Sequence, residues 1–439
     1  MKELTIRVLI ALVIATVIRV GFALVFQGPV YFGGISSGYI EAAKNFLAGN
    51  GFTVTVDASK INEPSKLVSV FFYMRPIAYS IFLASVFSVF WNSLIAVQII
   101  QALIGVLNCF LIYLTTKKIF GQKSAEISVF FSALFLPMAR FETTLLPDAL
   151  VGFLLLVGIY FLLRDDFVGA ALFGILTGLA TEFRPDSVLL PFFILPFLLI
   201  SRNIRQALTR WALIIVMVAL VLIPNTIANY KATNKIIPLG IGNGISMWEG
   251  ISQFGDKYGT VFGDERAAAV EGYRLWWYPN GVERDQKRFK EAIKIIEQHP
   301  VWYVGMLVKR SLMIFTIKGL FPSPVEYQNY LVVHPGASYL SYLRHEPISA
   351  LLKIFWTLLG WALFILAAMG FFTAMKTKRW RLAFPIALTI FYYFIVHIPT
   401  NAEPRYFFPM FGFEIVLASY FISRKTLKHE SKILEQQNQ

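Results

Sequence analysis

Three arginines and one aspartate occupy positions in this sequence that suit phosphate chemistry. Arg75, Arg184 and Arg405 each adjoin a proline beside a long apolar run, and Asp148 follows a proline at the start of another run. A guanidinium offers paired N–H donors that match the oxygens of a phosphate group. A carboxylate can orient or deprotonate a hydroxyl or amine. The four residues therefore predict a site for an anionic substrate, provided that the fold brings them together.

Three of these residues also have a purely structural explanation. Arg75 could extend its charge to a membrane surface and merely fix the depth of the neighbouring segment. Asp148 could stabilise the N-terminus of a helix. Arg184 could form a local ion pair with Glu182 or Asp186. What favours a functional site is that the four residues come from four different apolar runs and fall on one predicted face.

The composition of the chain indicates an integral membrane protein. Of its 439 residues, 56% are hydrophobic and only 15% are charged, whereas soluble domains are about a quarter charged. Apolar runs of membrane length recur along most of the sequence. Spanning segments must satisfy their own backbone hydrogen bonds, so these runs are expected to be helices. We therefore predict one transmembrane domain at residues 1–423 and a polar cytoplasmic tail at residues 424–439.

The distribution of basic residues selects ten spans from twelve apolar runs. Residues 76–91 are short for a span, and residues 302–320 are interrupted by three basic residues. If both runs lie in the membrane interface, the short basic connections all fall on the cytoplasmic side, as the positive-inside rule requires. The ten remaining spans are residues 5–26, 94–115, 124–141, 146–163, 168–183, 187–200, 211–227, 351–374, 382–397 and 406–422.

The predicted fold is therefore all-α: a polytopic helical bundle of about ten spans with juxtamembrane helices on its outer face. Both termini are expected in the cytoplasm, and the membrane is expected to be the plasma (inner) membrane. Two large outer segments, residues 27–93 and 224–350, hold most of the polar and glycine-rich sequence, so the active site is expected there. A short surface helix is expected to begin near Ser36 or Ser37 and to end at Gly49-Asn50-Gly51.

The remaining composition narrows the possible partners. The net charge of +14 is explained by basic loops between spans, so no nucleic-acid partner is expected. Cys109 is the only cysteine, and the five histidines lack ligand spacing. No cofactor is indicated with certainty, although Asp148 leaves a divalent metal ion open.

Several short motifs follow one another in a fixed order between about Arg19 and Ile422. They are Tyr39-Ile40-Glu41-Ala42-Ala43 through Gly49, Arg75-Pro76-Ile77-Ala78-Tyr79, Leu146-Pro147-Asp148, Gly178 to Pro185, Pro224-Asn225 to Trp248, His299-Pro300 to Tyr303, and Arg405-Tyr406. In this order the chain resembles the GT-C superfamily of polytopic glycosyltransferases. The nearest branch resembles the relatives of dolichyl-phosphate-mannose protein mannosyltransferase and of the lipid A aminoarabinose transferase (GT39/GT83-like).

The resemblance implies a reaction and a set of site residues. The donor would be a polyprenyl-phosphate-linked sugar, and the acceptor would attack its anomeric carbon with inversion. Arg75, Arg184 and Arg405 would bind the donor phosphate, and Tyr39 and Tyr79 would shape the pocket. Asp148 would orient the acceptor or bind a cation that does so.

The chain departs from the family at one position of the resemblance. The assisting acid is expected four residues before the tyrosine that matches Tyr39, where this sequence has Ile35. Glu41, Asp57 or Glu63 would have to replace it, or Asp148 would act alone.

Three functions remain open at this point. The first is a glycosyltransferase of the plasma membrane, part of cell-envelope glycosylation, acting on a protein, lipid or glycan acceptor and in contact with membrane lipids. The second is a catalytically impaired or binding-only relative, because Ile35 cannot accept a proton. The third is a lipid or solute transporter, which the lack of repeats and of midplane polar groups disfavours.

Overall fold

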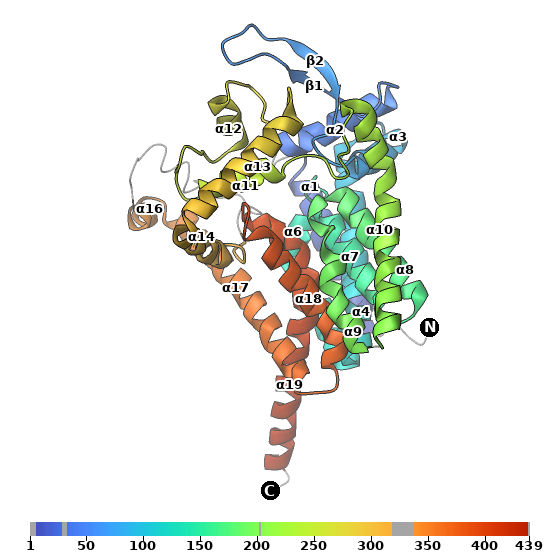
Figure 1. Ribbon diagram of the computed structural model, residues 1–439. Coiled ribbons are helices and arrows are strands. Elements are labelled where there is room, and N and C mark those ends of the chain that lie inside the picture. Colours follow the sequence, from blue (N-terminus) through green and yellow to red (C-terminus); the bar gives the residue numbers. More distant parts are fainter. Residues whose placement is uncertain (1–5, 29–32, 202, 318–337, 438–439) are drawn as a thin grey trace.

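The computed structural model describes residues 6–28, 33–201, 203–317 and 338–437. Within them the chain forms a helical bundle with a layer of shorter elements, called the cap here, over one end (Figure 1). The bundle consists of α1 (Ile6–Val25), α4 (Leu94–Phe120), α5 (Gln122–Leu134), α6 (Leu136–Glu142), α7 (Asp148–Leu162), α8 (Phe167–Phe183), η1 (Pro185–Ser187), α9 (Leu190–Ser201), α10 (Ile204–Thr233), α17 (Pro347–Met375), α18 (Trp380–His397), η2 (Pro404–Met410) and α19 (Phe411–Gln437).

The cap is built from the two long connections, between α1 and α4 and between α10 and α17. Its elements are α2 (Gly33–Leu47), β1 (Thr53–Asp57), β2 (Leu67–Phe71), α3 (Ala78–Val89), α11 (Asn243–Ile251), α12 (Asp264–Val270), α13 (Gly281–Gln298), α14 (Pro300–Met313) and α16 (Tyr339–His345). These connections overlap the two large segments predicted at residues 27–93 and 224–350, although α10 continues to Thr233. The fold class, a helical membrane bundle with additional helices at one end, is confirmed.

The helices coincide with the ten expected spans, but their lengths differ. Six segments are long and apolar enough to cross a membrane: α1, α4, α10, α17, α18 and η2 with α19. The pair α5–α6, bent by 63°, makes a seventh. At the other three predicted positions the described residues have the shorter apolar helices α7, α8 and η1 with α9, so six or seven segments have the length of a span where ten spans were predicted. α3 is also short, and its 12 residues would extend about 18 Å, well below the roughly 30 Å of a bilayer core.

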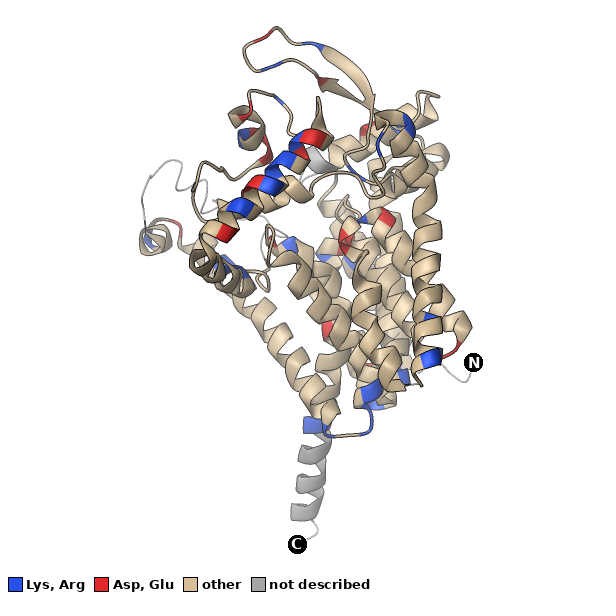
Figure 2. Cartoon of the chain, in the orientation of Figure 1, with Lys and Arg blue, Asp and Glu red and all other residues tan. Residues whose placement is uncertain are grey.

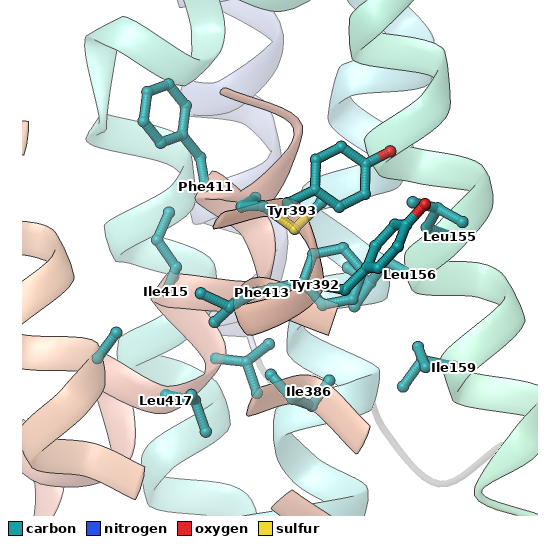
Figure 3. Packing of buried hydrophobic residues seen from close by; sticks show 14 of the residues in the cluster. Leu155, Leu156, Ile159, Ile386, Tyr392, Tyr393, Phe411, Phe413, Ile415 and Leu417 are labelled. Carbon is teal, nitrogen blue, oxygen red and sulfur yellow. The ribbon is translucent and has the colours of Figure 1, made fainter. Parts of the chain in front are cut away.

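The apolar core lies where α7, α18 and α19 meet (Figure 3). Leu155, Leu156 and Ile159 of α7 face Ile386 of α18 and Phe413 of α19, and all five are fully buried or nearly so. Close to this core, a Cβ at Gly152 would lie 2.7 Å from the Pro409 carbonyl oxygen. Only glycine lets η2 pack this closely onto α7. The contact fixes η2 beside the first turn of α7, where Asp148 lies.

Three local features differ from the sequence-based expectations. β1 and β2 form an antiparallel hairpin, with Val54 opposite Val70, inside a segment for which no strand was predicted. α2 begins at Gly33, and the Ser36 hydroxyl donates a hydrogen bond to the Leu145 carbonyl oxygen instead of capping the helix. At the C-terminus, α19 continues as one helix to Gln437, through the predicted tail.

Charge is distributed unevenly along the bundle axis. Figure 2 shows lysine and arginine gathered at the end of the bundle away from the cap, near the start of α1 and in the connection between α17 and α18. Lys117 and Lys118 lie in the last turn of α4, just before the short connection to α5. The cap instead carries charges of both signs, most densely along α13.

Candidate active site

A cavity of about 270 Å³ lies where the cap meets the bundle. Its walls come from α2, the β2–α3 loop, the first turn of α7, the α8–α9 junction, α11 with the loop before it, the end of α18, and η2. The charged and polar side chains that line it are Tyr39, Arg75, Asp148, Arg184, Asp186, Asn243, Ser246, Tyr392, His397, Thr400, Arg405 and Tyr406. The three arginines and the aspartate predicted from the sequence thus share one cavity.

Arg75 stands in the loop between β2 and α3. This loop is held by the segment before α11, because the Ile241 N–H donates to the Met74 carbonyl oxygen at 3.3 Å. At Gly240, which has a φ of +86°, an added Cβ would lie 2.7 Å from the same oxygen, so this approach requires glycine. Among the described residues Arg75 forms no ion pair, and its buried Nε has no hydrogen-bond partner. Its guanidinium therefore has donors left for a ligand.

Arg184 follows α8 and is held between two carboxylates. It forms ion pairs with Asp148 at the start of α7 and, at 2.9 Å, with Asp186. Its guanidinium also lies over the Tyr406 ring, 4.7 Å from the centroid. The local ion pair with Asp186 that the sequence offered for Arg184 is present, and Arg184 also lines the cavity. Asp148 consequently has a cation beside it, which makes it a poor base.

Arg405 enters the cavity from η2, next to Tyr406. Its Nε lies 3.0 Å from the Glu403 carboxylate, and its guanidinium lies 5.0 Å from the centre of the Tyr406 ring. The Tyr406 ring is therefore shared by two arginines. Aromatic faces attract guanidinium groups and hold them parallel to the ring, so Tyr406 sets the positions of both cations.

Asp186 and His397 were missed as a pair by the sequence reasoning. Asp186 Oδ2 lies 3.3 Å from His397 Nε2, and the Tyr392 hydroxyl donates to the Asp186 backbone carbonyl. The neighbouring Ser187 hydroxyl lies 2.8 Å from the Tyr393 hydroxyl. No local spacing links residue 186 with residue 397, so only the fold brings them together.

The two predicted tyrosines have different positions. Tyr39 lines the cavity, and burial raises the pKa of its hydroxyl, which keeps it neutral. Tyr79 lies behind it, edge-on at 5.1 Å between ring centroids, and donates to the Gln101 side chain at 3.0 Å. Tyr79 therefore supports the pocket wall without lining it, which corrects the expectation that it is a pocket residue.

Glu41 does not belong to the cavity, and its predicted catalytic role is wrong for this geometry. Its carboxylate accepts a hydrogen bond from the Thr55 N–H at 2.7 Å and so fastens α2 to the hairpin. Asp57 is held by Ser59, whose hydrogen bonds lower the pKa of that carboxyl group. Glu63 accepts from the Lys60 N–H in the hairpin loop. Ile35 belongs to α2, but its side chain lies outside the described residues.

The described residues contain no group of three or more His, Cys, Asp or Glu side chains placed to hold a metal ion. Asp148, where the sequence left a cation open, instead faces the guanidinium of Arg184.

The cavity also contains neutral polar residues that the sequence gave little reason to select. Asn243 and Ser246 project from the first turn of α11, and Thr400 follows α18. The only signal was the glycine-rich run from Gly240 to Gly244, which the motif comparison took as the start of an outer loop.

Comparison with known proteins gives one matching sequence family. Residues 74–227 match the family described as dolichyl-phosphate-mannose-protein mannosyltransferase. These residues include Arg75, Asp148 and Arg184. No curated protein sequence matches the chain.

Solved structures of similar shape cover almost the whole chain. One is the apo oligosaccharyltransferase of Archaeoglobus fulgidus, with a TM-score of 0.53 and 14% identity over 98% of this chain and 52% of the other. A second is the same organism's oligosaccharyltransferase AglB with an inhibitory peptide and a dolichol-phosphate, with a TM-score of 0.52 and 12% identity over 98% and 51%. A third is ArnT from Cupriavidus metallidurans bound to undecaprenyl phosphate, with a TM-score of 0.50 and 14% identity over 95% and 60%. The chain spans only about half the length of the first two, and at these identities the likeness concerns the fold.

Proposed function

The chain has the fold of the GT-C superfamily, as its motifs predicted, and on this basis we propose that it is a membrane glycosyltransferase. It would transfer a sugar from a polyprenyl-phosphate-linked donor to an acceptor at the cap end of the bundle. The observation that carries this proposal is the cavity in which Arg75, Arg184 and Arg405 converge from three separate segments. Phosphate groups are bound by such arginine clusters, and developing negative charge is stabilised by them.

The charges of the cavity support a single phosphate group. Three arginines and two carboxylates, Asp148 and Asp186, line it, which leaves a net charge of three minus two, or +1. A sugar phosphodiester carries one negative charge and would neutralise this excess. Arg75 would make the first contact because its donors are unoccupied. Two of the similar structures contain a lipid phosphate, dolichol-phosphate in one and undecaprenyl phosphate in the other.

In the reaction, an acceptor oxygen or nitrogen forms a bond to the anomeric carbon while the bond from that carbon to the phosphate oxygen breaks. The electron pair leaves with the phosphate, where the arginines stabilise it. Asp148 is neutralised by Arg184, so its role would be to hold Arg184 and the acceptor in place. Asn243, Ser246 and Thr400 would donate and accept hydrogen bonds to sugar hydroxyl groups.

The membrane orientation follows from the basic end of the bundle. Lysine and arginine gather away from the cap, so that end would be cytoplasmic by the positive-inside rule. The cap and the cavity would then lie on the outer face of the plasma (inner) membrane, and both termini in the cytoplasm. Residues 1–423 would act as one transmembrane domain, and the acceptor, whether protein, lipid or glycan, would approach from outside.

The proposal is tested by measuring the binding of undecaprenyl phosphate to the full chain in detergent, together with sugar transfer. Arg75→Ala should weaken binding about 10- to 100-fold, because a charge-assisted hydrogen bond contributes about 1.5–3 kcal/mol. Arg274→Ala is the matched control, since Arg274 pairs with Asp57 in the cap, outside the cavity. Equal binding by both variants, or no transfer by the unaltered chain with a panel of polyprenyl-phosphate sugars, would contradict the proposal.

Ile35 favours a second candidate, a chain that binds the donor and does not transfer the sugar. Isoleucine can neither accept a proton nor polarise a nucleophile. Replacing it tests the idea directly: Ile35→Asp should raise transfer at least tenfold over the unaltered chain if a missing acid is the only defect. Efficient transfer by the unaltered chain would exclude this candidate.

A further inference from the structure

Asp186 and His397 stand next to each other in the wall of the cavity. Asp186 Oδ2 lies 3.3 Å from His397 Nε2, and the same carboxylate oxygen lies 2.9 Å from Arg184 Nη2. An imidazole beside a carboxylate is a common arrangement of a general base, because the carboxylate orients the ring and stabilises the imidazolium that forms. The pair therefore has the parts of a proton acceptor inside the site proposed for the sugar donor.

Two tyrosines of α18 hold the pair in place. The Tyr392 hydroxyl donates to the Asp186 backbone carbonyl and accepts from the Leu189 N–H at 3.2 Å. The Tyr393 hydroxyl lies 2.8 Å from the Ser187 hydroxyl. These contacts fasten η1 to the end of α18, so the fold sets the distance within the pair.

The end of α18 is also held from the cap. Arg310 of α14 is fully buried and donates to the Ile398 and Pro399 carbonyl oxygens at 2.9 and 3.0 Å. The Tyr303 hydroxyl donates to the same Pro399 oxygen at 2.6 Å. Both carbonyl groups directly follow His397, so the helix end that carries the imidazole is bound by the cap as well as by η1. Rigid support of this kind is what a reacting side chain needs to keep its geometry.

The groups that face the imidazole come from η1, η2 and α18 itself. Asp186 is in direct contact, and the Tyr393 and Tyr406 rings lie 5.7 and 5.0 Å from the imidazole between centroids. Two guanidinium groups, those of Arg184 and Arg405, lie against the Tyr406 ring. The contact with Asp186 favours the tautomer with its proton on Nε2, which leaves the lone pair on Nδ1. An unperturbed imidazole has a pKa of about 6.5, so it is mostly neutral above about pH 7 and can accept a proton there.

We propose that His397, positioned by Asp186, accepts the proton that the acceptor hydroxyl loses during sugar transfer, which rests on the function proposed above. The acceptor oxygen bonds to the anomeric carbon, and the bond from that carbon to the phosphate oxygen breaks, with its electron pair leaving on the phosphate. The proton passes to Nδ1 of His397, and the imidazolium returns it to water when the products leave. The imidazole gains one positive charge as the phosphate gains one negative charge, so the total charge of the cavity stays the same during the reaction.

The other groups near the donor site fit this role less well. Asp148 is already paired with Arg184, which lowers its basicity. Burial raises the pKa of the Tyr39 hydroxyl, so it keeps its proton. The family position for the assisting acid holds Ile35, which has no titratable group. A base at His397 would explain how the chain works without an acid at position 35.

The test is sugar transfer by the full chain, measured as kcat, as KM for the donor and as a pH profile. His397→Gln should lower kcat about 10²- to 10⁴-fold and leave the KM for the donor and undecaprenyl phosphate binding unchanged. The unaltered chain should lose rate as the pH falls through the range in which histidine titrates, about pH 5–8, because the base becomes protonated. His397→Gln should lack this fall. Asp186→Asn should lower kcat and move the fall to lower pH, since the carboxylate no longer stabilises the imidazolium.

A second histidine provides the matched control. His299 follows α13 and stacks on the Tyr258 ring at 4.1 Å between centroids, outside the cavity, so His299→Gln should behave like the unaltered chain. Added imidazole should restore part of the rate of His397→Ala, because a free base can enter the space that the side chain leaves.

The outcomes distinguish a failure of this inference from a failure of the proposed function. If the unaltered chain transfers sugar and His397→Gln keeps its kcat and pH profile, this inference alone is overturned. If His397→Gln also loses undecaprenyl phosphate binding, and imidazole restores no rate to His397→Ala, the residue is structural and the inference is again overturned. If the unaltered chain transfers no sugar, the proposed function has failed and the inference falls with it.

Discussion

A buried ion pair between α1 and α6 gives the sharpest stability prediction. Arg19 Nε donates to Glu142 at 2.7 Å, Asn108 donates to the other carboxylate oxygen at 2.9 Å, and Arg19 also reaches the Ser132 carbonyl oxygen at 3.2 Å. Arg19 is fully buried and Glu142 is 3% exposed. Arg19→Ala would leave Glu142 as an uncompensated buried charge.

The expected loss is about 3–5 kcal/mol, the range for removing one partner of a buried pair. Unfolding entropy scales with chain length, and for 439 residues it gives a shift of about 1 °C per kcal/mol. Arg19→Ala should therefore lower the midpoint of thermal unfolding in detergent by at least about 3 °C. Membrane helices persist after unfolding, which reduces the entropy and makes the shift larger.

The same helix offers a matched control. Arg7 also lies on α1 and pairs with Glu126 at 3.3 Å, but its side chain is 71% exposed. Arg7→Ala should cost less than about 1 kcal/mol, as surface pairs do. The double variant Arg19→Met with Glu142→Gln should recover much of the loss, since it leaves no buried charge. Equal shifts for Arg7→Ala and Arg19→Ala, or no recovery in the double variant, would refute the reasoning.

Three further predictions concern the cavity. Asp148→Asn should tighten undecaprenyl phosphate binding severalfold, because it releases Arg184 from one of its two counter-charges; weaker binding in titration calorimetry would count against this. Gly152→Ala should destabilise the chain by about 1–3 kcal/mol in detergent unfolding, because its Cβ would meet the Pro409 carbonyl at 2.7 Å; an unchanged midpoint would show that η2 is free to move. Tyr79→Phe should cost about 1–2 kcal/mol, since it leaves the Gln101 side chain without its donor, while lipid phosphate binding should stay within twofold.

The sequence predicted that Arg75 and Asp148 come together because residues 76–91 were expected to lie in the interface and not to span the membrane. The structure has both residues in one cavity. Glu41 was misplaced because helical spacing does not say which face of α2 meets the cavity. The face holding Glu41 meets β1 instead.

The search for membrane spans did not detect the β-hairpin or contacts between residues far apart in the sequence. Thr53 to Asp57 alternates apolar and polar residues, which is typical of a strand, but the search was made for apolar runs of membrane length. Asp186 and His397 are more than two hundred positions apart in the sequence, and their contact at 3.3 Å exists only in the folded chain. Contacts across such distances follow from packing, and no local pattern records them.

Neighbouring carboxylates balance most of the positive charge of the cavity. Three guanidinium groups line a cavity of about 270 Å³, and their positive charges repel one another. Asp148 and Asp186 pair with Arg184, and Glu403 pairs with Arg405, which offsets this repulsion. Arg75 forms no such ion pair among the described residues, so a donor phosphate would be its direct partner.

Transfer would then place a second negative charge on the leaving lipid phosphate. Arg184 already faces Asp148 and Asp186, so part of its charge is balanced before the reaction begins. Arg75 forms no ion pair among the described residues, so its guanidinium would be the more available one to balance the new charge on the phosphate.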